Sequence, residues 1–237
     1  MSTKIWPAWF TTPPSLLDTL LSLHCRCCDV ALAHSQLCRA CEEGLPWNRT
    51  ACGHCALPMQ TSGICPRCLR RPPGFDSAFA AFRLGAPVLH GVHALKYHAV
   101  FSQSNWLGAL MARQLDQRGA ELPQLLIPVP LNPLRLMRRG YNQAAEIGRH
   151  FETQLGLKMD VTNATRLRQI DDQIGQSLSA RRRNMRGAFA VNGDLTGMHV
   201  ALIDDVMTPG ATLNELARAC RRAGAAHIEA WAVARTP

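Results

Sequence analysis

Apolar residues gather along this chain in several short continuous runs, which indicate strands that are buried on both faces. The clearest runs cover residues 200–203, 125–130 and 228–234, and looser apolar patterns cover residues 75–84 and 159–164. Continuous apolar strands are typical of parallel sheets, because helices cover both faces of such a sheet.

Helical spacing of apolar residues marks three longer segments, at residues 90–111, 144–155 and 213–223. The order strand, helix, strand between residues 200 and 234 is a βαβ unit, whose two strands run parallel. We therefore predict an α/β fold for residues 73–237, with a parallel sheet flanked by helices.

The residues before this domain divide into two parts. Residues 1–24 carry leucines at helical spacing from Ser15 onward and predict an amphipathic helix. This segment lacks the basic face of helices that lie on membranes, so we expect it to pack against the protein itself. Residues 25–72 form a cysteine-rich module that ends at two prolines and a glycine, which stop a preceding element.

Ten cysteines occur in the 237 residues, and eight of them form four CxxC pairs within the module. Each half of the module has two pairs, and the spacers between them are equal in length, so the halves repeat one plan. Four thiolates are a complete tetrahedral ligand set for a structural zinc ion and leave no position open for catalysis. The expected ligands are Cys25, Cys28, Cys38 and Cys41 in the first half, and Cys52, Cys55, Cys65 and Cys68 in the second. We predict a double zinc ribbon with one ion per half; an interleaved pairing and a half without metal stay open.

Thiolate ligands also favour a reducing compartment. The sequence has no secretory signal and no run of about 20 apolar residues that would span a membrane. We therefore expect a cytoplasmic protein without membrane insertion, because the cytoplasm keeps thiols reduced.

Two adjacent carboxylates, Asp204 and Asp205, follow the apolar run at 200–203, at the end of a strand where α/β sheets bind ligands. A turn of hydroxyl and small residues comes next and opens a helix, whose N-terminus favours an anion. The turn residues are Thr208, Pro209, Gly210, Ala211 and Thr212. Carboxylates for sugar hydroxyls followed by a phosphate cradle predict a ribose 5-phosphate ligand, and an ordinary strand–turn–helix is the alternative.

Basic residues give the chain a formal net charge of +9, which favours an anionic partner such as a phosphate or a nucleic acid. Arg138 and Arg139 follow the run at 125–130, and they either reach the anion or form a basic surface turn. Lys96 and Tyr97 could face a ligand, but we expect them on a solvated helix face.

A second basic cluster, Arg181, Arg182 and Arg183, lies in the polar segment 166–186. The segment either closes over a reaction centre or contacts the phosphates of single-stranded DNA. Phe189 is the only aromatic residue nearby, so DNA binding there would depend mainly on charge.

The segment LIDDVMTPGATL at residues 202–213 resembles the phosphoribosyl-pyrophosphate (PRPP) loop of type I phosphoribosyltransferases. The resemblance implies that Asp204 and Asp205 contact the ribose hydroxyls and that residues 208–212 hold the 5-phosphate. It also implies a Mg2+ ion that bridges the hydroxyls and the pyrophosphate of PRPP.

The same resemblance implies that the loop after the first core strand, with Pro130 and Leu131, contacts the pyrophosphate. Pro209 departs from the family pattern, which usually has threonine or serine there. Because proline has no N–H group to donate, one phosphate contact is in doubt.

Nearly the whole chain resembles the ComF family of competence proteins, which includes GntX-type DNA-utilisation proteins. The resemblance rests on the cysteine pairs, on PVPLNPLRLMRRGYNQA at residues 128–144, on QIGQSLSARRRNMRGAF at 173–189 and on the loop at 202–213. It implies a zinc ribbon joined to a type I phosphoribosyltransferase-like domain that acts in uptake or use of external DNA. The expected partners are PRPP, single-stranded DNA, and a helicase or another DNA-uptake protein. Transfer of phosphoribose to an unknown acceptor, PRPP binding without catalysis, and a docking scaffold all stay open.

Overall fold

The computed structural model describes residues 23–32, 36–167, 187–208 and 210–237. The chain divides into two compact units, Met1–Leu45 and Pro46–Pro237. The helix predicted at residues 1–24 lies outside the described residues except for its last two positions, which are extended.

The described part of the first unit contains two short strands and one short helix. Strand β1 (Leu23–His24) pairs antiparallel with β2 (Ala31–Leu32), and helix α2 (Arg39–Glu43) follows. Cys38 caps α2, because its side chain accepts a hydrogen bond from the backbone N–H of Cys41. The cysteine spacing thus sets the local turn as well as the ligand set.

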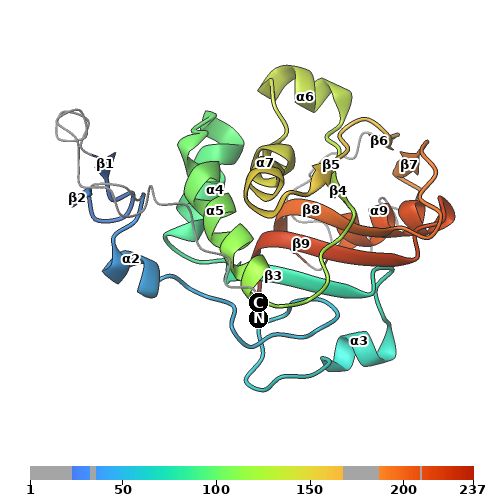
Figure 1. The fold of residues 1–237 in the computed structure, drawn as a ribbon, viewed down its shortest axis with the longest axis horizontal. Coiled ribbons are helices and arrows are strands. Elements are labelled where there is room, and N and C mark those ends of the chain that lie inside the picture. Colours follow the sequence, from blue (N-terminus) through green and yellow to red (C-terminus); the bar gives the residue numbers. More distant parts are fainter. Residues whose placement is uncertain (1–22, 33–35, 168–186, 209) are drawn as a thin grey trace, which may run out of the picture. The chain divides into compact units, whose positions relative to one another are not determined.

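A five-stranded sheet forms the centre of the second unit, and all of its neighbouring strands run parallel. The order across the sheet is β3 (Ser77–Arg83), β9 (His227–Arg235), β8 (His199–Met207), β4 (Leu125–Pro128) and β5 (Lys158–Met159). The central strand β8 is fully buried from Val200 to Ile203, as its apolar run predicts. A separate antiparallel pair joins β6 (Ala164–Arg166) to β7 (Phe189–Val191). The structure confirms the predicted parallel α/β sheet (Figure 1).

Helices cover both faces of this sheet (Figure 1). The helices described in the second unit are α3 (Pro66–Arg70), α4 (Val88–His98), α5 (Ser102–Gln117), α6 (Pro133–Arg139), α7 (Gln143–Leu155) and α9 (Ala211–Arg222). Helix α9 packs on one face, where its Leu216 shares a buried cluster with Leu202 of β8. Helices α5 and α7 pack against each other on the opposite face, where Phe151 of α7 meets Trp231 of β9 edge to face. Alternate residues of the strands therefore serve two separate layers of the core.

The single helix predicted at residues 90–111 is wrong, because the chain forms α4 and α5 with a break between them. Ala99, directly after α4, adopts the left-handed conformation with φ of 53°. A residue in that conformation cannot continue a right-handed helix. The new helix, α5, starts at Ser102, and the hydroxyl of Ser104 in its first turn donates a hydrogen bond to the carbonyl of Phe101.

The strand predicted at residues 159–164 is also wrong, because only its two ends are extended. Asp160 folds the middle into a turn: its Oδ1 accepts hydrogen bonds from the backbone N–H groups of Thr162 (2.8 Å) and Asn163 (3.0 Å). Aspartate side chains commonly form such local turns, and they compete with regular strand pairing.

The second half of the cysteine module belongs to the same compact unit as the sheet. The backbone N–H of Ala78 in β3 donates to the carbonyl of Gly53 (3.1 Å). The buried Arg235, the last residue of β9, donates from Nε to the carbonyl of Cys55 (3.1 Å). These bonds attach the second half of the module to the edge of the sheet, and the predicted domain limits at residues 24 and 72 stay predictions.

Candidate functional site

The two adjacent carboxylates lie within β8, close to the end at which the next loop begins. The expectation that Asp204 and Asp205 follow the strand is wrong, because β8 continues to Met207. The reason is the pairing with β9, whose Ala232 and Ala234 remain in register with Asp204 and Val206. The carboxylates are therefore held by a rigid strand in the middle of the sheet.

Asp205 is almost completely buried and is only partly satisfied. It is 4% exposed, and its Oδ1 accepts a hydrogen bond from the backbone N–H of Val206 (2.8 Å). Its buried Oδ2 accepts no hydrogen bond from any residue that the structure describes. Lys96 Nζ lies 3.7 Å from this oxygen, close enough for an ion pair but too far for a hydrogen bond. A buried carboxylate oxygen without a donor is costly, so it is suited to accept a hydrogen bond from a ligand.

The neighbouring Asp204 has a raised pKa. Burial raises the pKa of its carboxyl group well above the ordinary value, and the adjacent charge of Asp205 raises it further. The Lys96 ammonium and the backbone N–H of Asp205, which donates to Asp204 Oδ1 (2.9 Å), partly oppose this rise. Two carboxylates with one nearby ammonium make a site that favours hydroxyl donors or a cation.

The turn after β8 leads directly into α9. Gly210 is the residue before the helix and has φ of 78°, a conformation that suits glycine. None of the side chains that the structure describes caps this N-terminus, so the first N–H groups of α9, from Ala211 and Thr212, are suited to an anion. Thr208 is exposed beside them, and Pro209 lies outside the described residues. The helix begins at Ala211, two residues earlier than predicted.

The loop that follows β4 starts beside the acidic pair. Pro128 of β4 is in register with Ile203, and the N–H of Val129 donates to the Ile203 carbonyl (2.8 Å). The next residues, Pro130 and Leu131, are half-buried and leave the sheet next to Asp204. The structure thus brings these two predicted residues to the same edge of the sheet as the carboxylates.

Arg138 and Arg139 lie on the short helix α6, which the sequence analysis did not predict. The signals for this helix are present: the Asn132 side chain accepts from the N–H of Leu134 (3.0 Å), and Gly140 ends the helix with φ of 80°. Arg138 is exposed, as predicted for a basic surface, whereas Arg139 donates to the Gln143 side chain.

Tyr97 lies on a solvated helix face as expected, with 63% of its surface exposed, whereas Lys96 turns to the acidic pair. The side chain of Lys96 is 28% exposed, and its ammonium lies near Asp205 and 5.9 Å from the centre of the Tyr97 ring. The Arg139 guanidinium lies 5.9 Å from the same ring. Two cations thus lie near the Tyr97 ring, and one of them, Lys96, also contacts the acidic pair. The contact between Lys96 and Asp205 joins α4 to β8 across more than 100 residues, so no local pattern indicated it.

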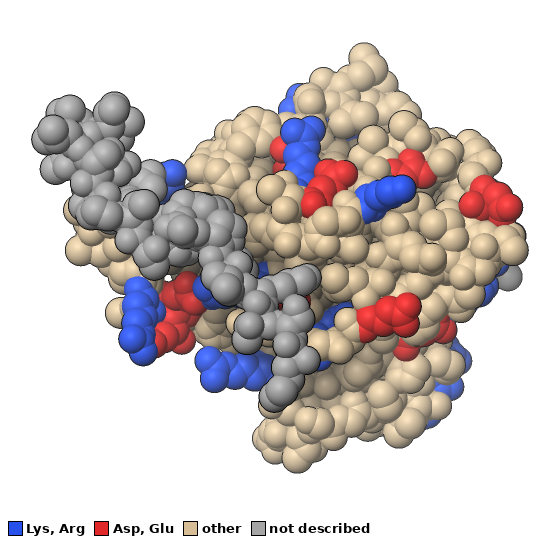
Figure 2. Space-filling view, in the orientation of Figure 1, with Lys and Arg blue, Asp and Glu red and all other residues tan. Residues whose placement is uncertain are grey.

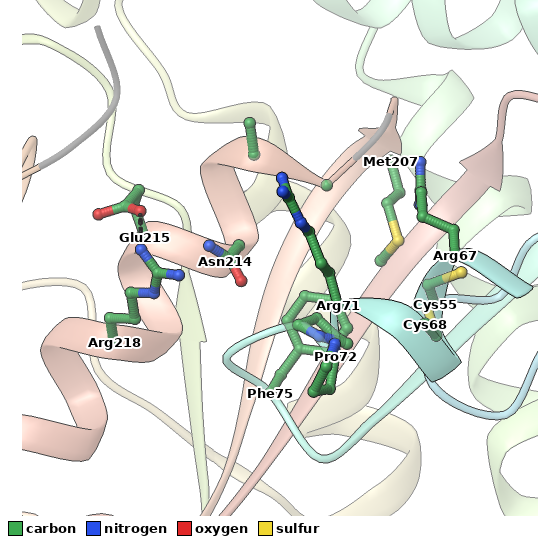
Figure 3. A pocket seen from close by; sticks show the side chains of 13 residues that line it. Cys55, Arg67, Cys68, Arg71, Pro72, Phe75, Met207, Asn214, Glu215 and Arg218 are labelled. Atoms are coloured by element: carbon green, nitrogen blue, oxygen red, sulfur yellow. Dashed lines mark hydrogen bonds and ion pairs between the residues drawn. The ribbon is translucent and has the colours of Figure 1, made fainter. Parts of the chain in front are cut away.

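A pocket of about 350 Å³ adjoins the turn after β8 (Figure 3). Three arginines line it: Arg67 and Arg71 from the second half of the cysteine module, and Arg218 from α9. Arg218 is paired with Glu215 (2.8 Å), and Figure 3 shows Arg71 extending toward the first turn of α9. The pocket therefore suits an anionic or polar group beside the predicted phosphate cradle. The predicted arginines Arg181, Arg182 and Arg183 lie outside the described residues.

Each half of the cysteine module brings its own four sulfur atoms together. The two tetrads are Cys25, Cys28, Cys38 and Cys41, and Cys52, Cys55, Cys65 and Cys68; within each, all Sγ atoms lie within 4.8 Å of one another. In both tetrads the sulfurs of the second and third cysteines are 3.7 Å apart. A tetrahedral zinc ion with Zn–S bonds of about 2.3 Å holds its sulfurs about 3.8 Å apart. The tetrads fit one structural zinc ion each, and the interleaved pairing is excluded.

Backbone N–H groups favour the thiolate form that zinc requires. The N–H of Cys38 donates to Cys25 Sγ (3.4 Å), and the N–H of Cys65 donates to Cys52 Sγ (3.2 Å) at the equivalent place in the other half. Burial by itself raises the pKa of the Cys25 thiol, but backbone hydrogen bonds, that of Cys38 first, lower this pKa to about 6. A thiolate at neutral pH binds zinc without a further loss of a proton.

The surface and the helices add two observations. On the face drawn in Figure 2, lysine and arginine side chains alternate with acidic ones, and the described residues form no continuous basic surface there. None of the helices in the described part of the chain has the length and hydropathy needed to cross a membrane.

Comparison with known proteins relates the chain to proteins that are named for DNA utilization and for competence. Residues 16–69 match the model of the double zinc ribbon domain. The DNA utilization protein YhgH of Salmonella typhimurium is 32% identical over 216 residues, which cover 87% of this chain and 93% of that protein. Competence protein F of Haemophilus influenzae is 31% identical over 229 residues, or 90% and 96% of the two chains.

The solved structures that match part of the chain include two enzymes that are named for phosphoribosyl chemistry. The glutamine PRPP amidotransferase from B. subtilis matches 54% of this chain and 25% of its own, with a TM-score of 0.36 and 19% identity. A purine phosphoribosyltransferase from Pyrococcus horikoshii matches 56% and 74%, with a TM-score of 0.34 and 18% identity. The family assignment rests on the sequence relatives: the chain belongs to the family of the DNA utilization protein YhgH and competence protein F.

Proposed function

We propose that this protein binds PRPP together with Mg2+ at the turn after β8, and that it acts in the uptake or use of external DNA. One observation carries the ligand: the buried Asp205 Oδ2 accepts no hydrogen bond from the described residues, next to a second carboxylate on the same strand. The vicinal hydroxyls of a ribose are donors that match two adjacent carboxylates. The role in DNA use rests on the names of the relatives.

The remaining parts of PRPP match the surroundings of the pair. The N-terminus of α9, with residues 208–212, would hold the 5-phosphate, and the segment with Pro130 and Leu131 would contact the pyrophosphate. Arg138 and Arg139 supply positive charge on the neighbouring helix α6. Mg2+ prefers oxygen ligands and would supply charge that neutralises the pyrophosphate when it is bound.

The direct test is calorimetric titration of the zinc-loaded full chain with PRPP and Mg2+. Asp204→Asn and Asp205→Asn should each weaken binding at least about tenfold, because each removes a charge-assisted acceptor worth about 1.5–3 kcal/mol. Asp116→Asn makes the same chemical change at an exposed position of α5 and should bind like the wild type. No heat of binding from the folded wild type, or equal binding by all variants, would refute the proposal.

Catalysis is the second part of this proposal to be tested. Transfer of phosphoribose to a base or an amine would release pyrophosphate, and the arginine-lined pocket beside the turn has room for an acceptor. A screen of nucleobases and amines for pyrophosphate release, with Asp204→Asn as the inactive control, would identify the reaction. PRPP binding without turnover over the whole screen would favour a non-catalytic protein.

A non-catalytic accessory protein that binds single-stranded DNA is the second candidate, and exposed aromatic rings favour it. Tyr97 is 63% exposed and Phe101 is 45% exposed, and Lys96 and Arg139 both lie near the Tyr97 ring. Exposed rings beside cations are the usual platform for stacked bases. Salt-sensitive DNA binding that survives Asp204→Asn but is lost in Tyr97→Ala would support this candidate. We place either function in the cytoplasm, with a helicase or another DNA-uptake protein as a further partner.

A further inference from the structure

Two histidines and a glutamate meet at the end of the sheet opposite the acidic pair. His199 begins β8 and His227 begins β9; the two residues are in register, and their ring centres are 4.6 Å apart. Glu229 lies two residues after His227 and therefore on the same face of the strand. One ligand atom from each of the three residues lies within 4.8 Å of the others.

Glu229 is held so that one oxygen remains for the histidines. The residue is 4% exposed, and its Oε2 accepts hydrogen bonds from Arg118 Nη2 (3.0 Å) and Trp231 Nε1 (2.8 Å). The other oxygen, Oε1, lies 3.2 Å from His199 Nε2. Partners that engage one carboxylate oxygen and orient the other are typical of metal ligands.

The distance between these two atoms fits ligands of one metal ion. With bonds of about 2.0–2.2 Å, a nitrogen and an oxygen on one ion are about 2.9 Å apart in an octahedral site and about 3.4 Å apart in a tetrahedral one. A hydrogen bond between His199 and Glu229 also fits 3.2 Å, but it gives no role to His227, whose ring lies within reach of both.

Neighbouring side chains contact the backbone of one histidine and lie close to the ring of the other. The backbone N–H of His199 donates to the Gln124 side chain (2.9 Å). His227 Nδ1 lies 3.6 Å from Asp76 Oδ2, and that carboxylate is itself paired with Arg221 (2.6 Å). A carboxylate behind a histidine is a common second partner in zinc sites, where it orients the imidazole ring.

The three residues also open into a cavity. The cavity has a volume of about 720 Å³, and its wall includes Gly53 and Glu121 besides the cluster. Three protein ligands with solvent access are the pattern of a zinc site that keeps one position for water or a small molecule. The six residues from His199 to Asp204 in β8 span about 17 Å, so this site is separate from the proposed PRPP site.

We propose that His199, His227 and Glu229 bind a divalent transition-metal ion, zinc by the type of ligands, with one coordination position directed to the cavity. This ion is additional to the two structural zinc ions of the cysteine module. Imidazole and carboxylate ligands suit zinc, whereas Mg2+ would avoid two histidines.

The test uses untagged, full-length protein whose cysteine tetrads are loaded with zinc and which is dialysed free of loosely bound metal. Calorimetric titration with zinc alone should reveal one further equivalent in the wild type. His227→Ala should weaken this binding at least about 100-fold. Loss of a group that only hydrogen-bonds to a metal ligand already costs about 10–100-fold in affinity, and loss of the ligand itself should cost more. His90→Ala removes an exposed histidine from α4 and should bind zinc like the wild type.

A second measurement guards against misfolding of a variant. His227 is half-exposed, so its replacement by alanine should leave the circular dichroism spectrum and PRPP binding unchanged. Crystals soaked in zinc should show an anomalous peak between the two imidazole rings and Glu229. No third equivalent in the wild type, or equal zinc binding by folded His227→Ala, would overturn the proposal and leave a plain hydrogen-bonded ion network.

Discussion

Replacement of Lys96 by methionine tests the electrostatic arrangement of the acidic site most directly. The side chain is 28% exposed, and its ammonium lies 3.7 Å from the buried Oδ2 of Asp205. Methionine keeps most of the length and the packing of the aliphatic chain while it removes the charge. The carboxylate of Asp205 then remains buried without a cation, and that loss should reduce the stability of the second unit.

The size of the effect follows from the distance and the exposure. Two unit charges 3.7 Å apart interact by about 1 kcal/mol in water and by about 4.5 kcal/mol at the effective dielectric constant of 20 that suits partly buried pairs. The ammonium retains some contact with solvent, so we expect a coupling of about 1–3 kcal/mol. Surface ion pairs, by comparison, contribute about 1 kcal/mol or less.

A double-mutant cycle with Lys96→Met and Asp205→Asn isolates this coupling. Urea unfolding at pH 7, followed by circular dichroism, gives the free energy of unfolding of the four zinc-loaded proteins. Lys96→Met should be destabilising alone and nearly neutral in the Asp205→Asn background, whereas Lys158→Met, on the exposed end of β5, should be neutral in both. A coupling energy below about 0.5 kcal/mol would show that Lys96 does not stabilise the carboxylate.

Three further predictions follow from the same contacts. Cys65→Ser should lower the unfolding free energy of the second unit by about 3 kcal/mol or more, because its zinc site folds with the sheet, whereas Cys28→Ser should leave that unit unchanged in urea unfolding. The pKa of Asp204 is raised in the folded protein, so protonation of this carboxyl group favours the folded state. That contribution to the free energy of unfolding is complete below about pH 4, the pKa in the unfolded chain, and is lost as the pH rises through the pKa in the folded protein. Asp204→Asn should therefore be more stable than the wild type at pH 7, and the difference should vanish toward pH 4 in thermal unfolding. Gly224→Ala should cost about 2 kcal/mol in urea unfolding, because φ is 99° and the new Cβ would lie 2.8 Å from the Thr196 Cα; a cost near zero would contradict that geometry.

Local signals account for the parts of the fold that the sequence analysis predicted correctly. The continuous apolar run at 200–203 is enough to indicate a strand buried on both faces, and the structure buries it completely. The CxxC pairs fix four ligands within 17 residues, so the two tetrads require no distant contact. The helix after this strand is local as well: α9 begins at Ala211, directly after the glycine of the turn, and the role of residues 208–212 in phosphate binding stays a prediction.

The errors arise where the deciding contact is distant or the local signal is weak. No glycine or proline marks the break at Ala99, whose left-handed conformation separates α4 from α5. The extension of β8 through Asp204 depends on pairing with β9, about 30 residues away. Lys96 and the pair His199 and Glu229 come together only through the sheet, so their roles could not be inferred from spacing.

The repeated halves of the cysteine module show what spacing leaves undetermined. Their ligands have the same separations and the same 3.7 Å sulfur contact, yet only the second half shares a compact unit with the sheet. The difference lies outside the cysteines: Arg235 donates to the Cys55 carbonyl, and Ala78 pairs with Gly53. Cysteine spacing encodes the geometry of zinc, whereas the residues around it determine what the ribbon attaches to. In this chain the second ribbon also brings Arg67, Cys55 and Cys68 to the wall of the pocket beside the predicted phosphate cradle, so a zinc site more than 100 residues away in the sequence adjoins that cradle.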